Sequence, residues 1–599
     1  MRLVWGVALF ALTACNAILG IGDIRVAGDD AGNPDTPPSD VQGTAIDVFY
    51  TSPTTTEMVP EDLSTFVLQA YIPDGSAAGF RVVDVTGHKD GTFTIPSVPA
   101  GRYYLLVLAP GAPIARFFET TSHTLDLGFK LLGRHIGPRA TQPTVLTLHL
   151  TGFSPIQTGD RFFLDSYATN ADTSFSSAAG ATSFDQSVDW KDLGAPLLDP
   201  TKGDDLYVVH QRRTTDSTTG ELRQTIVDAF STTALSLVDG QPASVTAAFQ
   251  VPAKSTTVSY SLDPASYLQD LDFPSHQPIS VVLRIRASFY GGASQGAPLL
   301  VALQTFSTST AMFSNSATYL DPFPADWPRT VLAFPNILWN YAARGTQRTG
   351  SLISAPIARK LVSPGFVEVS APFGAPHAIK VGGVDTSRAA AVPFDGMHPV
   401  TVEWAPVTGV RHYSVLVTHV VDNGTGADVI DITTLDTAAT TLSMPASLFK
   451  LGDSYVLTVT AMVDPTTDYA GGTLRLEGYP DGMREAATAR LLFAASCGNG
   501  TVDAAYEECD ASGAATATCN PDCTKPICGD GFANAAAGEV CDDAGESVAC
   551  NKDCTPASCG DGKINATRGE QCDLGAQNGQ PGACCSATCT LVPPATKCP

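Results

Sequence analysis

The sequence predicts an all-β protein, in which tandem β-sandwich domains are followed by a small disulfide-rich repeat tail. Three observations support this class. Between residues 44 and 495, apolar and β-branched residues alternate in short runs separated by turn residues, the pattern of half-buried strands. Long amphipathic helical windows are lacking there, which disfavours βαβ units. Fourteen of the fifteen cysteines lie between Cys497 and Cys598.

The composition limits the partners that the chain can have. Its 599 residues include 60 acidic and 35 basic side chains, which gives a net charge of −25. A chain of this length is expected to form several domains. Such an acidic surface repels phosphates, so we expect no nucleic-acid partner and no electrostatic docking on anionic lipid.

Residues 1–14 have the form of a signal peptide. The basic start Met1-Arg2 precedes the uncharged run Leu3–Leu12. This run is shorter than the roughly 20 apolar residues that cross a bilayer, and it matches the apolar region of a secretory signal. It ends in Leu12-Thr13-Ala14-Cys15, which resembles the lipobox of bacterial lipoproteins. The resemblance implies a diacylglyceryl group on the Cys15 thiol and cleavage before Cys15. The alternative is an ordinary signal peptide with a chance cysteine.

Residues 15–43 are expected to form the lipidated cysteine and a disordered spacer. The stretch Asp29–Asp40 is rich in Asp, Pro and Gly and cannot bury a core. Two or more acyl chains anchor a protein stably, whereas one chain is marginal. Asn16 stands where an Asp retains some bacterial lipoproteins in the inner membrane. We therefore expect a lipid-anchored protein of the bacterial outer membrane or cell surface, whose membrane partner is reached through the anchor.

Residues 44–143 are expected to form a first β-sandwich. Phe93 and Ile95 alternate on one face of a strand, Pro99–Gly101 supplies a turn, and Tyr103–Leu108 reads as the next strand. The stretch Asp90–Val107 resembles the hairpin of carboxypeptidase-regulatory, transthyretin-like modules. The resemblance implies a structural or adhesive module without catalytic residues. A generic β-hairpin is the alternative.

Residues 144–393 are expected to form one or two further β-sandwiches. Strands are predicted at regular intervals in the ranges 206–211, 244–251, 279–290, 298–308 and 365–369. Gly292–Gly296 matches the G-x-S-x-G pattern of serine hydrolases, with Ser294 as the nucleophile. That pattern requires a strand-to-helix elbow, and here both flanks read as strands, so a glycine-rich hairpin turn is the favoured interpretation.

Residues 394–495 resemble a fibronectin type III domain. The alternating strands Val400–Trp404 and Tyr413–Val417 are followed by Tyr455 in the strand-like stretch Phe449–Ala461. The resemblance implies that Trp404 and Tyr413 lie in the core. It also implies that Tyr455 forms a tyrosine corner, with its hydroxyl bonded to nearby backbone.

Residues 496–599 contain three cysteine-rich repeats. Their opening cysteines, Cys497, Cys528 and Cys559, are 31 residues apart, which marks a tandem array. Each repeat holds four cysteines, and Cys584 and Cys598 are left over as a further pair. Four thiolates can bind zinc, but an exported chain meets oxidising surroundings and the tail has no histidine. We therefore predict seven disulfides of undetermined connectivity. The cysteines are Cys497, Cys509, Cys519, Cys523, Cys528, Cys541, Cys550, Cys554, Cys559, Cys572, Cys584, Cys585, Cys589 and Cys598.

The repeats resemble the myxobacterial cysteine-rich repeat, and the third also resembles a disintegrin fragment in Ala583–Leu591. In disintegrin modules the equivalent loop binds calcium. Each repeat has Asn or Asp two and six residues after its opening cysteine, Glu two before the second cysteine and Asp just after it. Calcium prefers such oxygen ligands, so we predict calcium as the cofactor. Solvated turn carboxylates are the alternative. The predicted ligands are Asn499, Asp503, Glu507, Asp510, Asp530, Asn534, Glu539, Asp542, Asp561, Asn565, Glu570 and Asp573.

The expected function is adhesive or structural binding of an unknown protein or glycan, without enzymatic activity. This expectation rests on the kinds of module in the chain. Two alternatives remain open. One is a surface hydrolase that uses Ser294, and the other is an inert stalk that presents the cysteine-rich tail.

Overall fold

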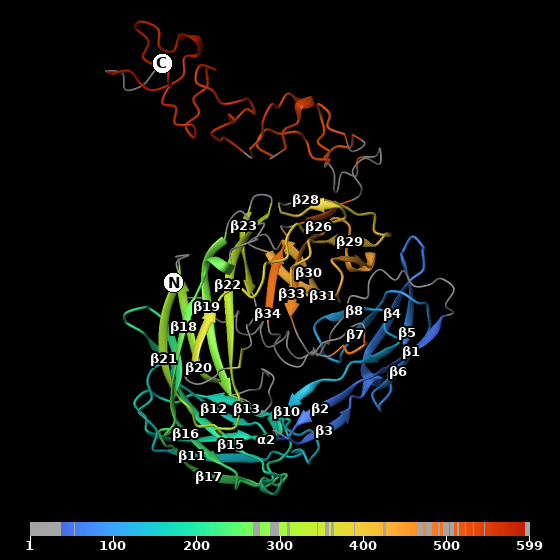
Figure 1. The fold of residues 1–599 in the computed structure, drawn as a ribbon, viewed down its shortest axis with the longest axis vertical. Coiled ribbons are helices and arrows are strands. Elements are labelled where there is room, and N and C mark those ends of the chain that lie inside the picture. Colours follow the sequence, from blue (N-terminus) through green and yellow to red (C-terminus); the bar gives the residue numbers. More distant parts are fainter. Residues whose placement is uncertain are drawn as a thin grey trace. The chain divides into compact units, whose positions relative to one another are not determined.

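The computed structural model confirms an almost entirely β architecture (Figure 1). By backbone contacts the chain divides into two compact units: the first contains residues 1–389, 401–445 and 455–490, and the second 390–400, 446–454 and 491–599. The only α-helix in the described residues is the short α2 (Trp190–Leu193). The structure describes residues 38–593 except 53, 268–275, 288–298, 308–311, 344–345, 354–358, 361–364, 388–389, 423–426, 464–470, 475–481, 489–490, 495–501, 503–507, 512–513, 522, 531 and 544.

The first sandwich begins earlier than the sequence predicts. Strand β1 starts at Ser39, inside the expected spacer, and its Val41 is fully buried. The spacer is therefore shorter than 15–43, because this polar stretch pairs with both β6 and β9 as the central strand of a sheet. The strands of this domain are β1 (Ser39–Thr44), β2 (Ile46–Tyr50), β3 (Thr56–Pro60), β4 (Val67–Pro73), β5 (Phe80–Val85), β6 (Thr92–Val98), β7 (Tyr103–Leu108), β8 (Ala115–Thr120), β9 (Thr124–Asp126) and β10 (Lys130–Leu132).

The predicted hairpin of the first sandwich is wrong in its pairing. Phe93 and Ile95 are buried on one face of β6, as expected. However, β6 pairs with β1, whereas β7 pairs with β4 and β8 in a different sheet. The turn at Pro99–Gly101 therefore connects two sheets of the sandwich. Alternation identifies a strand and its buried face, but it does not identify the neighbouring strand.

Residues 144–393 contain two sandwiches that share one long sheet. The nine-stranded sheet runs β13-β12-β15-β16-β20-β19-β22-β23, with β24 also paired to β22. Sheet β14-β11-β17 covers its first half and sheet β21-β18-β25 its second half, and each half has its own apolar core. The strands are β11 (Val145–Thr151), β12 (Arg161–Ser166), β13 (Ala171–Phe175), β14 (Ser183–Asp189), β15 (Leu206–Thr215), β16 (Leu222–Thr232), β17 (Ala243–Ala248), β18 (Ser255–Leu262), β19 (His276–Ala287), β20 (Leu299–Ser307), β21 (Phe313–Leu320), β22 (Arg329–Ala343), β23 (Thr346–Ile353), β24 (Arg359–Lys360) and β25 (Gly365–Val369).

The fibronectin-like domain has the expected aromatic core. Trp404 and Tyr413 are buried, and their rings meet edge to face at 5.2 Å. Tyr455 is buried as well, and its ring stacks on His419. The Tyr413 hydroxyl accepts the Val407 N–H at 2.9 Å, which is the kind of bond predicted for Tyr455. The strands are β26 (Lys380–Val381), β27 (Val384–Asp385), β28 (Ala390–Pro393), β29 (Val400–Glu403), β30 (His412–Asp422), β31 (Ala427–Thr437), β32 (Thr441–Met444), β33 (Ser454–Val463), β34 (Gly482–Ala487) and β35 (Leu491–Ala494).

The first and last sandwiches are joined edge to edge, although they lie far apart in sequence. Strand β8 pairs in parallel with β31, so Ala115–Phe118 meets Thr433–Asp436. Within the first unit the sheet runs β33-β30-β31-β8-β7-β4-β5. Arg116 of β8 makes a buried ion pair with Asp436 of β31. A simple tandem array, as the sequence predicts, would place only consecutive sandwiches in contact. In the structure the first and last sandwiches also pair, through β8 and β31.

Buried His412 lies near this junction and is expected to make stability fall in acid. Burial and the charge of Arg116 lower the pKa of His412 from 6.5 to about 4. Between these pH values the His412 imidazole stays neutral in the folded state but is protonated in the unfolded chain. The free energy of unfolding therefore falls as the pH drops from about 6.5 towards 4. Between pH 7 and pH 5 the loss from this group is about 2 kcal/mol.

Urea unfolding of the wild type and of His412→Leu at pH 7 and pH 5 measures this loss. The variant is expected to lose less stability on acidification than the wild type. His88→Leu, which replaces an exposed histidine, is the control and is expected to behave as the wild type does. Equal pH dependence in His412→Leu and the wild type would show that His412 is not the group responsible.

Candidate interaction site in the cysteine-rich tail

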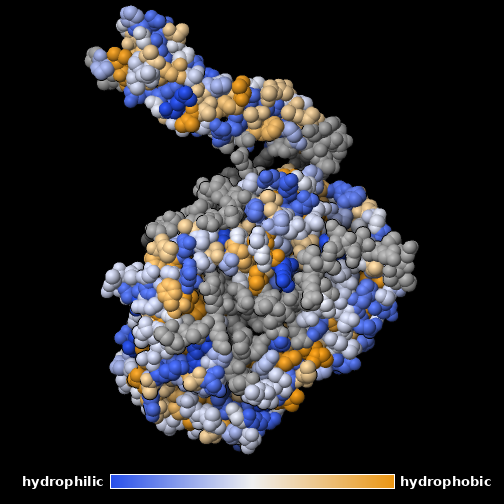
Figure 2. Space-filling view, viewed as in Figure 1, coloured by the Kyte–Doolittle hydropathy of each residue, from blue (hydrophilic) through white to orange (hydrophobic). Residues whose placement is uncertain are grey.

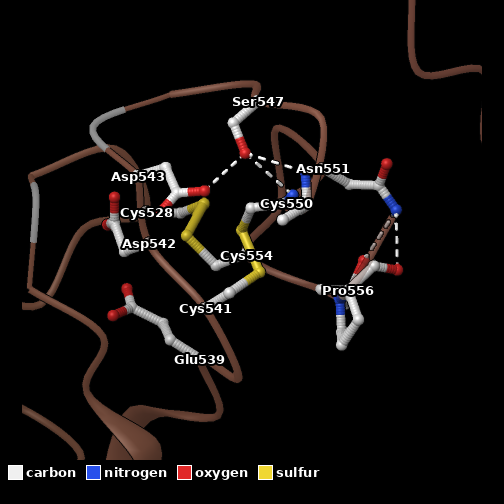
Figure 3. Close-up of a disulfide and its surroundings, with 12 residues drawn as sticks. Cys528, Glu539, Cys541, Asp542, Asp543, Ser547, Cys550, Asn551, Cys554 and Pro556 are labelled. Atoms are coloured by element: carbon white, nitrogen blue, oxygen red, sulfur yellow. Dashed lines mark hydrogen bonds between the residues drawn. A yellow bond between two sulfur atoms is a disulfide. The ribbon is translucent and has the colours of Figure 1, made fainter. Parts of the chain in front are cut away.

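The disulfides of the tail follow one pattern. The three cysteine-rich repeats form three small units that open at Cys497, Cys528 and Cys559. In the second cysteine-rich unit Cys528 pairs with Cys554, and Cys541 pairs with Cys550. The other described pairs are Cys559–Cys589, Cys572–Cys585 and Cys509–Cys519. Each complete unit thus joins its first cysteine to its fourth and its second to its third. Figure 3 shows the two bonds of the second unit next to each other, with the carboxylates of Asp542 and Glu539 beside them.

The remaining cysteines are consistent with the predicted count. Cys523 and Cys584 are also disulfide-bonded. Cys497 and Cys598 lie outside the described residues, and the repeat pattern predicts that Cys497 pairs with Cys523. Disulfide sulfurs carry no thiolate charge, so the zinc alternative is excluded for the described cysteines.

The fourth cysteine of each unit has an unusual backbone conformation. Cys523, Cys554 and Cys589 adopt positive φ angles of 58°, 57° and 56°. This left-handed conformation disfavours residues with a Cβ. It coincides with a shared hydrogen-bond pattern, in which the carbonyl of Cys554 accepts the N–H groups of both Val540 and Cys541. The carbonyls of Cys523 and Cys589 do the same in their units. The geometry therefore repeats where the side chains between the cysteines differ.

The predicted calcium ligands of the second unit accept backbone N–H groups. Asp542 Oδ2 accepts the N–H groups of Gly529 (2.7 Å) and Asp530 (3.1 Å). Glu539 Oε2 accepts the N–H of Asn534 at 2.7 Å. The recurring carboxylates thus stabilise the turn between the first and second cysteines, because each ionised oxygen receives a charge-assisted hydrogen bond.

The same bonds recur in the third unit. Asp573 Oδ2 accepts the N–H groups of Gly560 (2.7 Å) and Asp561 (3.2 Å). Its Oδ1 accepts the N–H of Gly575 (2.7 Å) and the Asn578 amide (2.9 Å). Burial alone would raise the pKa of Asp573, but these hydrogen bonds outweigh burial and lower it. Both oxygens of this carboxylate are therefore already occupied by donors.

The described ligands do not form a calcium shell, which takes about six to eight oxygens. Glu570 Oε2 accepts the Asn565 N–H at 2.9 Å, whereas its buried Oε1 has no hydrogen-bond partner. Two clusters bring ligand-type atoms within 4.8 Å: Asp542 with Cys528 and Cys554, and Glu570 and Asp573 with Cys589. The sulfurs in both clusters are in disulfides, so few free oxygens remain for a cation. Calcium binding stays a prediction that titration tests.

Other predicted site residues lie outside the described part of the chain. These are Cys15, Ser294, Asn499, Asp503 and Glu507. Asp510 is described and half-buried.

The strands before and after Ser294 bear on the alternative that the protein is a serine hydrolase. They are β19 and β20, which pair with each other antiparallel. The G-x-S-x-G stretch therefore connects two neighbouring strands, whereas a nucleophile elbow leads from a strand into a helix.

The tail exposes large apolar side chains. Among the described residues, seven of the seventeen exposed large hydrophobic residues belong to it, although it is less than a fifth of the chain. Figure 2 shows orange atoms of this kind on the visible face of the tail. The seven are Val502, Ile527, Phe532, Val540, Val548, Ile564 and Val592. The disulfides hold the backbone that carries these side chains.

Sequence reasoning missed a buried cluster of one histidine and two aspartates in the second sandwich. His210 is fully buried, with Nδ1 3.0 Å from Asp228 Oδ1 and Nε2 3.0 Å from Asp160 Oδ2. The Phe162 ring stacks on its imidazole at 4.5 Å. The two acids lie 18 and 50 residues from His210. No local motif links them, and only strand pairing brings the three together.

Comparisons with known proteins assign no family to this chain. No family model matches the chain, and no curated protein matches it. Among solved structures, the FN1-FN3 domains of chicken CNTN1 are 9% identical, covering 76% of this chain and 99% of theirs, with a TM-score of 0.11. A candidate cell adhesion protein of Bacteroides eggerthii DSM 20697 is 12% identical over 37% of this chain and 81% of its own, with a TM-score of 0.13. A Streptococcal ancillary pilin is 12% identical over 56% and 100%, with a TM-score of 0.11.

Proposed function

We propose that this protein is a lipid-anchored bacterial surface protein with an adhesive or structural binding role, and that its tail makes the contact. The observation that carries the proposal is the concentration of exposed apolar side chains on a disulfide-bonded scaffold. Apolar surface that stays in water is a common mark of protein interaction sites. A scaffold held by disulfides loses little conformational entropy when it binds. The partner that fits this surface is a protein.

A bead assay tests the tail. Beads that carry the oxidised protein are expected to attach to cells of the producing strain, and the double variant Phe532→Ser/Val540→Ser is expected to lose most of this attachment. Met58→Ser is the matched control, because Met58 is an exposed apolar residue of the first sandwich. Attachment that survives deletion of residues 497–599 would overturn the proposal for the tail.

The anchor is tested separately. Among the described residues, no helix has the length and apolarity needed to cross a bilayer. A lipid on Cys15 is proposed as the membrane attachment because Leu12-Thr13-Ala14-Cys15 resembles a lipobox. Cys15→Ala is expected to abolish incorporation of labelled palmitate and to release the protein from the membrane fraction. Labelled protein from the variant would refute lipidation at Cys15.

The Ser294 hydrolase is the remaining alternative, and it is the weaker one. The antiparallel pairing of β19 with β20 disfavours an elbow at this position. Hydrolysis of ester substrates by the wild type, lost in Ser294→Ala, would support the hydrolase.

A further inference from the structure

The junctions between consecutive cysteine-rich units repeat one arrangement of side chains. The residue after the third cysteine is Asn520 in the first unit and Asn551 in the second, and both are buried. Each lies against the unit that follows. The Asn520 amide nitrogen donates to Asp530 Oδ2 at 2.9 Å, and the Asn551 amide nitrogen donates to Asp561 Oδ2 at 3.0 Å.

A second asparagine completes each junction. Asn534, which is fully buried, donates from its amide nitrogen to Asn520 Oδ1 (2.8 Å) and to the carbonyls of Thr516 (2.9 Å) and Cys519 (3.2 Å). Its own oxygen accepts the N–H groups of Ala536 and Ala537.

The next junction repeats these contacts one unit later. Asn565 donates from its amide nitrogen to Asn551 Oδ1 (3.1 Å) and to the carbonyls of Ser547 (2.8 Å) and Cys550 (3.2 Å). Its oxygen accepts the N–H of Arg568 at 2.8 Å.

We infer that Asn520 and Asn551 are clasps that fix each cysteine-rich unit to the next. The Asp and Asn that stand two and six residues after Cys528 and Cys559 receive the clasp. The tail is then a stiff array with a repeated unit-to-unit interface. This role accounts for the recurrence of Asp530, Asn534 and their counterparts without a bound cation. The Asn534 oxygen accepts two N–H groups, which uses both of its lone pairs, and its amide nitrogen is a donor that offers no lone pair to a metal.

The sequence differs at the ends of the array in the way that this role requires. The third unit has Ser586 in the clasp position, and its hydroxyl accepts the N–H groups of Thr588 and Thr590 in its own loop. The first unit has Asn499 and Asp503, the reverse order of amide and acid. An Asp in the second position carries no amide hydrogens, so it cannot make the donor contacts of Asn534. Only the junctions between the first and second units and between the second and third units therefore have all of these asparagine hydrogen bonds.

Hydrogen exchange of the full oxidised protein in detergent tests the clasp. The N–H of Ser558 donates to Asp561 Oδ2, so it reports on the second junction. Asn551→Ala is expected to accelerate its exchange about tenfold or more, because the carboxylate loses its partner across the junction. The Gln571 and Cys572 amides, which bond to the Cys589 carbonyl within the third unit, are expected to be unchanged.

Two further variants separate the clasp from a calcium site. Asn565→Asp removes the amide donor and is expected to loosen the junction, whereas a calcium ligand would tolerate this change because it keeps an oxygen. Ser586→Ala occupies the equivalent position of the third unit and is expected to leave Ser558 protected. Asn520→Ala repeats the test at the first junction if Asn551→Ala does not fold. The inference is overturned if Ser558 exchange is unchanged in Asn551→Ala, or if calcium chloride slows exchange at the junction equally in the wild type and Asn565→Asp.

Discussion

Asp436→Ala is expected to destabilise the protein by about 3–5 kcal/mol, since it leaves a buried charge without its partner. The Arg116 Nη2 donates to Asp436 Oδ1 at 2.9 Å, and the side chain of Asp436 is fully buried. This ion pair lies where β8 and β31 join the first sandwich to the fibronectin-like one. Beside it, the Thr437 hydroxyl donates to Glu119, so the junction contains further buried polar groups. Loss of Asp436 is therefore expected to weaken the pairing of two domains as well as the local packing.

Urea unfolding measures this effect, and two variants control for it. Arg102→Ala removes a half-exposed arginine 3.8 Å from Glu119, and it is expected to change stability by less than about 1 kcal/mol. The double variant Arg116→Met/Asp436→Leu replaces the pair with apolar groups and is expected to recover most of the lost stability. A change below 1 kcal/mol in Asp436→Ala would show that the junction does not form in solution.

Reduction is expected to unfold the cysteine-rich tail and leave the sandwiches folded. No cysteine lies between Cys15 and Cys497, so a reductant has no bond to break in the sandwich body. In the chain-entropy model, the Cys559–Cys589 bond, with a sequence separation of 30, contributes about 3.6 kcal/mol to its unit. The Cys541–Cys550 bond, with a separation of 9, contributes about 2.6 kcal/mol. A small unit with little apolar core depends on such bonds.

Calorimetry and limited proteolysis before and after reduction check this expectation. The main melting transition is expected to stay in place while protease sites open within residues 502–593. Cys559→Ser/Cys589→Ser is expected to open the third unit more than Cys541→Ser/Cys550→Ser opens the second, because the longer loop costs more entropy to close. A tail that resists protease after complete alkylation of its thiols would contradict a disulfide-dependent fold.

Strand positions could be predicted from the sequence more readily than strand partners. The ranges 206–211 and 365–369 lie on β15 and β25, and the range 298–308 contains β20, because alternation of apolar residues reports burial on one face of a sheet. Partners depend on contacts between distant segments. The alternation of Phe93 and Ile95 predicts a strand, yet β6 pairs with β1, and β7 belongs to another sheet.

For the candidate site as well, the sequence predicts the positions of the recurring residues but not their binding partners. The recurrence of Asp530 and Asp561 was visible as a sequence period, and the chemistry of carboxylates made calcium the natural interpretation. The hydrogen bonds from Asn551 to Asp561 and from backbone N–H groups to Asp573 are visible only in three dimensions. The sequence does not point to Asn520 and Asn551, because an Asn beside a cysteine gives no signal by itself.

The sequence by itself determined the all-β class, the cysteine-free body, the three-unit tail and the positions of the strands and cysteines. These properties follow from composition, period and spacing, which are local along the chain. Only the tertiary structure decided which strands share a sheet, which cysteines pair and what the recurring acids bind. Those outcomes depend on groups as far apart as Arg116 and Asp436, which meet because burying a charge requires an opposite charge in contact with it.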